Sequence, residues 1–155
     1  MVRMRIGVIS DTHGLLRPSA KAFLSGSDRI IHAGDIGKPE VLQELSELAP
    51  VTAVRGNNDR GTWAETLPET DCLSAEGVLI YILHDLQQLE KEELGARVKA
   101  VVSGHSHKPV MSDRGGILYL NPGSAGPRRF KLPVTVAEVL VSGEKFTARI
   151  VEIPL

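Results

Sequence analysis

The stretch RIGVISDTHGLLRPSAKAFLSGSDRIIHAGD, residues 5–35, decides the fold class of this chain. Two short apolar runs rich in β-branched residues, Arg5–Ser10 and Arg29–His32, are typical of strands. Between them Pro18–Ser25 is expected to form a helix, because Pro18 suits a first turn, where its missing N–H has no helical partner. A strand, a helix and a second strand in such short succession predict a βαβ unit and hence a parallel sheet.

The alternation of expected strands and helices continues through residue 54. Pro39 opens a second expected helix, which Pro50 ends, and Val51–Val54 follows as a third strand. The apolar residues of this helix fall at the spacing of one buried stripe: Val41, Leu42, Leu45 and Leu48. The first sixty residues therefore predict an alternating β and α order.

The second half of the sequence departs from this alternation of strands and helices. Val78–Leu83 is a continuous apolar run, as expected for a strand covered on both faces, and a polar helix is expected over Leu86–Leu94. Ala100–Ser103 is a further expected strand. Beyond it, turn sequences at 113–116 and 142–145 separate alternating β segments. This pattern predicts an antiparallel closing half.

Composition narrows the functional classes. The 155 residues are 42% hydrophobic, which is enough for one domain, 1–155, with an ordinary core. A net charge of −1 and only 3 Phe, 2 Tyr and 1 Trp argue against a surface for long nucleic acid. A single cysteine, Cys72, suits a reducing cytosol, and we expect neither a leader segment nor a membrane span. The sequence thus predicts a cytoplasmic protein.

Polar residues stand at the carboxyl ends of five expected strands. They are Asp11, Asp35, Asn57, His84 and His105. Taken singly, an aspartate after a strand is more often a helix cap, and a histidine beside an apolar run is more often a packed side chain. Because ligands bind at the carboxyl ends of parallel strands, the whole series instead favours one shared site.

Two more imidazoles extend this series. His13 lies two residues from Asp11, and His107 lies two residues from His105. Carboxylate, imidazole and amide oxygen together suit first-row divalent cations better than Ca²⁺. The donors are too many for one ion and suit two. Glycines precede three of them and permit close approach of the backbone: Gly34, Gly56 and Gly104.

These motifs resemble those of the calcineurin-like metallophosphoesterase superfamily. In chain order they are Asp11-Thr12-His13, Gly34-Asp35, Gly56-Asn57-Asn58-Asp59, His84 and Gly104-His105-Ser106-His107. The run Asn121-Pro122-Gly123-Ser124 further resembles the small bacterial and archaeal phosphodiesterase branch. The resemblance covers residues 6–128 and implies an α/β fold, a four-layer sandwich of two mixed β-sheets flanked by helices.

The resemblance also implies a centre of two divalent metal ions, with Mn²⁺ foremost and Fe²⁺, Ni²⁺ or Zn²⁺ as alternatives. The implied ligands are Asp11, His13 and His107 for the first ion, Asn57, His84 and His105 for the second, and Asp35 as a bridge. The implied reaction is hydrolysis of a small phosphate ester through in-line attack by a hydroxide that bridges the metals.

Position 58 departs from many members of the family, which have a histidine that protonates the leaving group or positions phosphate. Asn58 cannot supply a proton at neutral pH. Asp59, another group, or a leaving group that needs no proton could compensate. This predicts a preference for diesters or for esters with acidic leaving groups. Asp35, Asn58 and Asp59 are the catalytic candidates. Asn58, Arg60 and Arg128 are expected to contact the substrate, with Arg129 as a further candidate.

Two other residues have alternative interpretations. Asp85 stands after His84, where related proteins usually have glycine, and it either orients a neighbouring imidazole or caps a helix. We favour the cap. His32 is expected to pack or to support the ligands rather than to be one.

A different class remains possible, because a retromer subunit shares this fold and acts as a non-catalytic scaffold through protein contacts. The complete ligand set favours the enzyme, since convergent buried charges without a cation are costly.

The expected partner is a small phosphate ester. A nuclease for long duplex DNA is disfavoured by the lack of a basic groove, and a homodimer through the apolar C-terminal half stays open.

Overall fold

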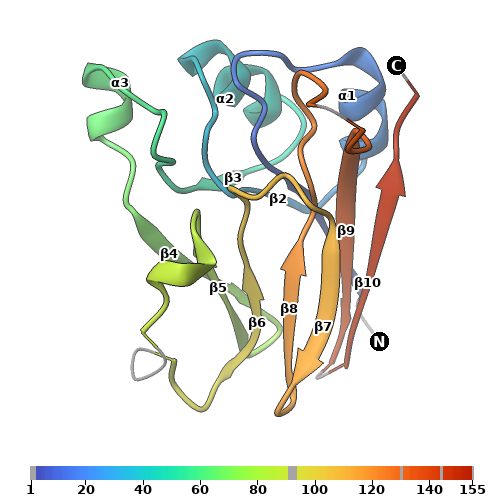
Figure 1. The fold of residues 1–155 in the computed structure, drawn as a ribbon. Helices are drawn as coiled ribbons and strands as arrows, with labels where there is room; N and C mark the ends of the chain where they lie inside the picture. The colour runs from blue at the N-terminus through green and yellow to red at the C-terminus, as the bar shows by residue number, and fades with distance from the viewer. Residues whose placement is uncertain (1–2, 91–93, 130, 144, 155) are drawn as a thin grey trace.

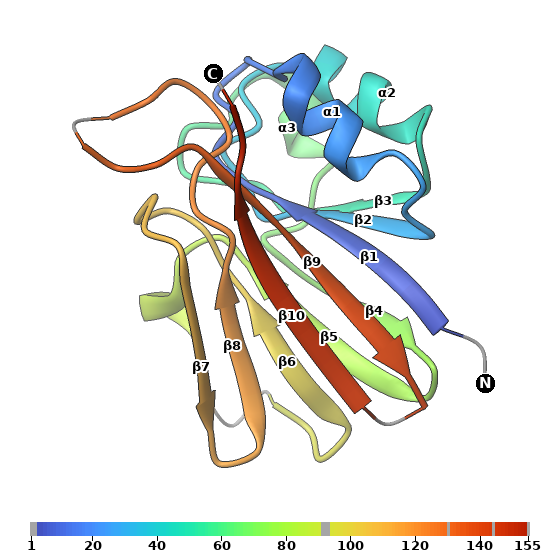
Figure 2. The ribbon, with the colours of Figure 1, turned by 90° about the vertical axis from the view of Figure 1, so that its right-hand side faces the viewer.

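The computed structural model describes residues 3–90, 94–129, 131–143 and 145–154. Two five-stranded sheets lie face to face, and the α-helices lie together at one end of the molecule, above the first sheet in Figure 2. The first sheet has the strand order β10-β9-β1-β2-β3, and the second has the order β4-β5-β6-β8-β7. Figure 1 shows the same strands from the side, with the chain coloured from its N-terminus to its C-terminus.

In chain order the elements are β1 (Arg3–Ile9), α1 (Pro18–Leu24), β2 (Arg29–His32), α2 (Pro39–Ser46), β3 (Val51–Ala53), α3 (Thr62–Glu65), β4 (Thr70–Ala75), β5 (Val78–Leu83), the 3-10 turn η1 (Leu86–Gln88), β6 (Val98–Val102), β7 (Val110–Arg114), β8 (Ile117–Asn121), β9 (Thr135–Ser142) and β10 (Lys145–Glu152).

The first sheet confirms the predicted βαβ order. Strands β1, β2 and β3 pair in parallel, and helices α1 and α2 connect them. Each helix begins at its proline, Pro18 or Pro39, without a side-chain cap. Strand β9 then pairs antiparallel with β1, and β10 pairs antiparallel with β9. The sheet is therefore mixed.

The second sheet corrects one expectation about the closing half. The hairpins β7–β8 and β9–β10 are antiparallel, as predicted, although Glu144 in the second turn lies outside the described residues. Strand β8, however, pairs in parallel with β6, with Ala100 opposite Leu118. Strand β8 lies between β6 and β7, its hairpin partner. A turn sequence indicates only the hairpin partner of a strand, so the turns could not predict the pairing of β8 with β6.

The predicted helix over Leu86–Leu94 is wrong in its described part. Only Leu86–Gln88 forms a short 3-10 turn, residues 89–90 are not helical, and residues 91–93 lie outside the described residues. Leu86, Leu89 and Leu94 pack on the outer face of the second sheet, against Tyr81 and Tyr119. Contact with the sheet, rather than helix formation, accounts for the leucines of this segment.

Two elements were not expected from the sequence, α3 and β4. Strand β4 stands at the edge of the second sheet, and its first three residues, Thr70–Cys72, are exposed. An edge strand with so little buried surface carries a weak apolar pattern. It is held by antiparallel pairing with β5.

Three apolar clusters separate four layers, which confirms the predicted sandwich of two mixed sheets, although the layer over the second sheet is a segment with the turn η1 rather than a helix. The main cluster lies between the sheets and includes Val8 and Ile31 from the first and Ile80 and Val102 from the second. Another joins the first sheet to the helices, and a third lies under the segment that begins at Leu86. Among the described residues, no helix has the length and apolar character needed to cross a membrane.

Candidate metal centre

The loops that follow β1, β2, β3, β5 and β6 meet where the two sheets come together. Backbone bonds tie the first two loops, since Asp11 N–H donates to Gly34 O at 3.0 Å and His13 N–H donates to Asp35 O at 2.9 Å. The second sheet joins them through His105 N–H, which donates to Asp11 Oδ2 at 3.1 Å. Residues nearly one hundred positions apart thus become neighbours.

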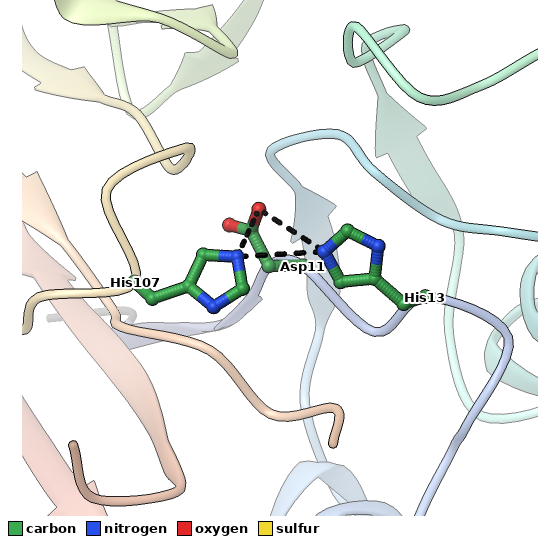
Figure 3. Close-up of side chains that lie close together, drawn as sticks. All are labelled: Asp11, His13 and His107. Carbon is green, nitrogen blue, oxygen red and sulfur yellow. Dashed lines mark hydrogen bonds and ion pairs between the residues drawn. The ribbon is translucent and has the colours of Figure 1, made fainter. Parts of the chain in front are cut away.

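Asp11, His13 and His107 form one cluster of donor atoms. Figure 3 shows the Asp11 carboxylate between the two imidazole rings. Asp11 Oδ1 lies 3.3 Å from His107 Nε2 and 3.8 Å from His13 Nε2, and the two nitrogens are 3.4 Å apart. One donor atom from each residue lies within 4.8 Å of the others, so the three could hold one cation.

Asp35 lies between this cluster and a second one. Its Oδ2 is 3.7 Å from His13 Nε2 and 3.3 Å from His84 Nε2. Asp11 Oδ1 is also 3.9 Å from His84 Nε2, so Asp11, Asp35 and His84 form a second group that could hold a cation. The structure thus places both carboxylates between the two sets of imidazoles.

Asn57 and His105, the other two predicted ligands of the second ion, lie beside this group. Asn57 Oδ1 is 3.1 Å from His105 Nδ1, and the His105 ring stands edge-on to that of His84 with centroids 5.2 Å apart. Both residues are exposed, whereas Asp11, Asp35 and His84 are buried. This side of the centre therefore faces solvent.

The donor atoms fit a cation, as His84 shows. Its Nδ1 lies 2.7 Å from Ala33 O, which assigns the Nδ1 hydrogen to that carbonyl and leaves Nε2 facing Asp35 Oδ2. His84 Nε2 and Asp11 Oδ1 are both buried without a hydrogen-bond partner. An imidazole lone pair that faces carboxylate oxygens needs a positive charge between them. A proton or a divalent ion would supply it.

The pKa values of Asp35 and His84 also indicate that the centre favours a positive charge. Burial alone would raise the pKa of Asp35, but the adjacent His84 imidazole and the hydrogen bond from Asn58 N–H hold it well below its usual range. Burial would lower the pKa of His84, yet Asp35, Asp11 and the Ala33 carbonyl together raise it. In the metal-free protein the carboxylates thus favour a proton on His84, which a metal ion would displace.

The backbone at the centre is strained. Left-handed conformations occur at five of the seven predicted ligands: Asp11, His13, Asp35, His105 and His107. Side chains other than glycine seldom adopt this region, and such strain gathers at functional sites.

Two of the predicted glycines permit the close approach of these loops. A Cβ on Gly104 would stand 2.6 Å from Asp11 Oδ2 and would collide with Ser10 Oγ. A Cβ on Gly56 would collide with Asp35 itself. The lack of a side chain at these positions lets the loops from separate strands close around the carboxylates.

Asn58 and Asp59 occupy different places. Asn58 is exposed, and its backbone and side-chain N–H groups donate to the two oxygens of Asp35 at 2.9 and 3.0 Å. Asp59 is buried, and its two oxygens accept from Gly37 N–H and Gly56 N–H. Asn58 thus forms hydrogen bonds with a predicted metal ligand, whereas the Asp59 carboxylate stabilises the loop that follows β3.

The predicted arginines lie on the surface. Arg60, Arg128 and Arg129 are all exposed, and Arg128 Nε donates to Leu132 O at 3.3 Å. Side chains of this length can still reach a bound anion.

The expected supporting role of His32 and the expected cap at Asp85 are confirmed. His32 is fully buried, accepts from Gly34 N–H at Nδ1 and lies 3.0 Å from Thr12 Oγ1 at Nε2. Asp85 Oδ1 accepts from Gln87 N–H at the start of η1, and its other oxygen lies 4.0 Å from His105 Nε2.

Sequence reasoning gave no structural role to Asn121 and Ser124, which entered it only as part of a family motif. Asn121 Nδ2 donates to Gly104 O at 2.9 Å and to Ser106 Oγ at 3.1 Å. Ser124 Oγ donates to Asp11 O at 2.9 Å. These side chains brace two loops that carry ligands. The available signal was the place of Asn121 at a strand end.

Two facing mixed sheets with carboxylates and imidazoles at the joined strand ends define a metallophosphoesterase fold. The chain belongs to the calcineurin-like phosphoesterase superfamily, whose domain profile matches residues 4–144. It is 37% identical to a probable metallophosphoesterase of Methanothermobacter thermautotrophicus, over 96% of this chain and 92% of that protein. It is 29% identical to the phosphodiesterase YfcE of Escherichia coli K12, over 78% and 79% of the two chains.

The fold also resembles a solved structure of Vacuolar Protein Sorting 29 from Cryptosporidium parvum. The TM-score is 0.78 at 19% sequence identity, with 97% of each chain covered. This likeness shows the fold alone.

Proposed function

We propose that this protein is a dinuclear metal-dependent phosphodiesterase that hydrolyses small phosphate esters. The observation that carries the proposal is the place of Asp35 Oδ2, 3.7 Å from His13 Nε2 and 3.3 Å from His84 Nε2. A carboxylate between imidazoles from two different loops suits a ligand that two cations share.

The proposed centre assigns a set of ligands to each ion. Asp11, His13 and His107 would hold one ion, and Asn57, His84 and His105 would hold the other. Asp35, whose Oδ2 lies near His13 and His84, would be shared by both. Mn²⁺ is the proposed metal, with Fe²⁺, Ni²⁺ and Zn²⁺ as alternatives, because mixed oxygen and nitrogen donors suit these ions. When bound, two divalent ions activate water near neutral pH and offset the negative charge of a phosphate ester.

The chain's other polar groups would act on the substrate. The exposed Asn58 amide would donate to a phosphate oxygen, and Arg60 and Arg128 would reach the outer oxygens. Asp59, held by two backbone amides, would position this loop. Because Asn58 supplies no proton, we expect esters with acidic leaving groups to react best. The likeness to a named phosphodiesterase at 29% identity supports the diester preference.

A non-catalytic scaffold is the second candidate, since Vacuolar Protein Sorting 29 shares the fold. Seven metal-type donors, with the fully buried Asp11 among them, favour the enzyme, because such a cluster is costly without a cation. The homodimer and the cytoplasmic location stay predictions.

A panel of esters and metals tests the proposal. Bis(4-nitrophenyl) phosphate, 4-nitrophenyl phosphate and a 2′,3′-cyclic nucleotide are each assayed with Mn²⁺, Fe²⁺, Ni²⁺ and Zn²⁺. We expect diester cleavage with Mn²⁺, and a loss of about 100-fold or more in Asp35→Asn. A wild-type protein that binds no Mn²⁺ and cleaves no ester would overturn the proposal. A clear preference for 4-nitrophenyl phosphate over bis(4-nitrophenyl) phosphate would overturn the diester assignment.

A further inference from the structure

A cavity of about 300 Å³ lies beside His105, on the side of the second sheet that carries β7 and β8. It shares His105 and Asp85 with a larger hollow of about 470 Å³, which is also lined by Asn57 and His84. The two hollows therefore flank one of the proposed ligands. The chemistry proposed above uses only the hollow that contains Asn57 and His84.

The walls of the smaller cavity are largely apolar. Val110 lines it with 48% of its surface exposed, and Leu86 and the ring of Tyr119 form other parts of the wall. The guanidinium carbon of Arg114 lies 5.0 Å from the centroid of the Tyr119 ring. Apolar walls with a flat cation over an aromatic ring suit a planar, apolar group.

The charges around this cavity favour an anionic molecule. Two cationic side chains, Lys108 and Arg114, line it together with one carboxylate, that of Asp85. A phosphodiester carries one negative charge and two ester arms. A diester bound at the proposed centre would thus find a net positive, apolar hollow directly beside His105.

We propose that this cavity binds the retained arm of a phosphodiester, and that this arm is an aromatic group. The inference rests on the proposed function. We assign the leaving arm to the side of Asn58, which bonds to Asp35, because neither Asn57 nor Asn58 lines the cavity. On this assignment the arm next to His105 is the one that stays on the phosphate. The volume accommodates a ring larger than phenyl.

Two substrates that differ only in the retained arm test this assignment. Bis(4-nitrophenyl) phosphate and methyl 4-nitrophenyl phosphate release the same leaving group and carry the same charge. Val110→Asp places a carboxylate in the apolar wall of the exposed strand β7. Repulsion between this charge and the phosphate affects both substrates and cancels in the ratio of their kcat/KM values.

The neighbour Met111 offers a matched control, since it is 46% exposed on the same strand and lies outside this cavity. With Mn²⁺ we expect Val110→Asp to lower the kcat/KM ratio, aryl over methyl, about tenfold, mainly through KM. Val110→Ala should lower it less, and Met111→Asp should leave it unchanged. An unchanged ratio in Val110→Asp, or an equal fall in Met111→Asp, overturns the subsite while the phosphodiesterase stands. A wild type that cleaves neither diester overturns both.

Discussion

At the scale of single residues, the proposed ligands depend on unfavourable backbone conformations. Asp11, His13 and Asp35 all have positive φ angles, between 46° and 55°. Each such conformation costs about 1–3 kcal/mol and persists only where neighbouring bonds fix it. Here the N–H groups of Asp11 and His13 donate to the adjoining loop. The ligands are thus held in place before any metal arrives.

His32 shows how burial behind the ligands makes stability depend on pH. Burial lowers its pKa to about 4, against the partial opposition of Asp11 and Asp59. The unfolded chain binds this proton near pH 6.5, so the contribution is present above pH 6.5 and is lost as the pH falls toward 4. It amounts to about 3 kcal/mol.

We therefore expect metal-free wild type to lose more stability between pH 6.5 and 4 than metal-free His32→Gln. Urea unfolding with a chelator present, at several pH values, measures the difference. Equal losses in the two proteins would contradict this account of His32.

At the scale of elements, each strand determines where a donor emerges and the following loop determines where the donor points. The apolar runs in the sequence predicted the exact bounds of β2 and β5, because both strands are buried and polar or small residues follow them directly. The same method missed β4, an exposed edge strand, and predicted a helix at 86–94 where leucines pack on a sheet. Local patterns thus succeed where burial is complete on one or both faces.

Asn121, at the end of β8, supports the loop that carries His105 and His107. Asn121→Ala would remove the hydrogen bonds that Nδ2 donates to Gly104 O and Ser106 Oγ. Supporting contacts of this kind typically change metal affinity by about 10–100-fold. We expect Mn²⁺ affinity, measured by titration calorimetry, to fall within that range while the circular dichroism spectrum is kept.

Asp113→Ala is the matched control, because Asp113 Oδ1 accepts from Gly116 N–H at the other end of the same hairpin. It should alter stability slightly and leave Mn²⁺ affinity unchanged. Similar affinity losses in both variants would show that Asn121 acts only through hairpin stability.

At the scale of the whole molecule, the centre joins the two sheets. Asp11 and Asp35 come from the first sheet, whereas His84, His105 and His107 come from the second. A cation that binds residues from both sheets stabilises the folded chain over the unfolded one.

We expect Mn²⁺ at about 100 times its Kd to raise unfolding free energy by about 2.7 kcal/mol. For a chain of this size that corresponds to roughly 5–10 °C in Tm. Calorimetric scans with Mn²⁺ and with a chelator measure the shift. Asp35→Asn, which removes the shared carboxylate, should show a much smaller one. A shift of the same size in the variant would mean that Mn²⁺ binds elsewhere.

The sequence by itself determined the alternating β and α order of the first sixty residues and the presence of polar residues at the ends of five strands. It could do so because buried strands leave a local apolar signal, and parallel strands bring their carboxyl ends to one edge. Only the tertiary structure decided that β8 pairs with β6, that Asp59 bonds to backbone amides, and that a cavity opens beside His105. These features depend on contacts between residues far apart in the chain, and no local period of the sequence records such contacts.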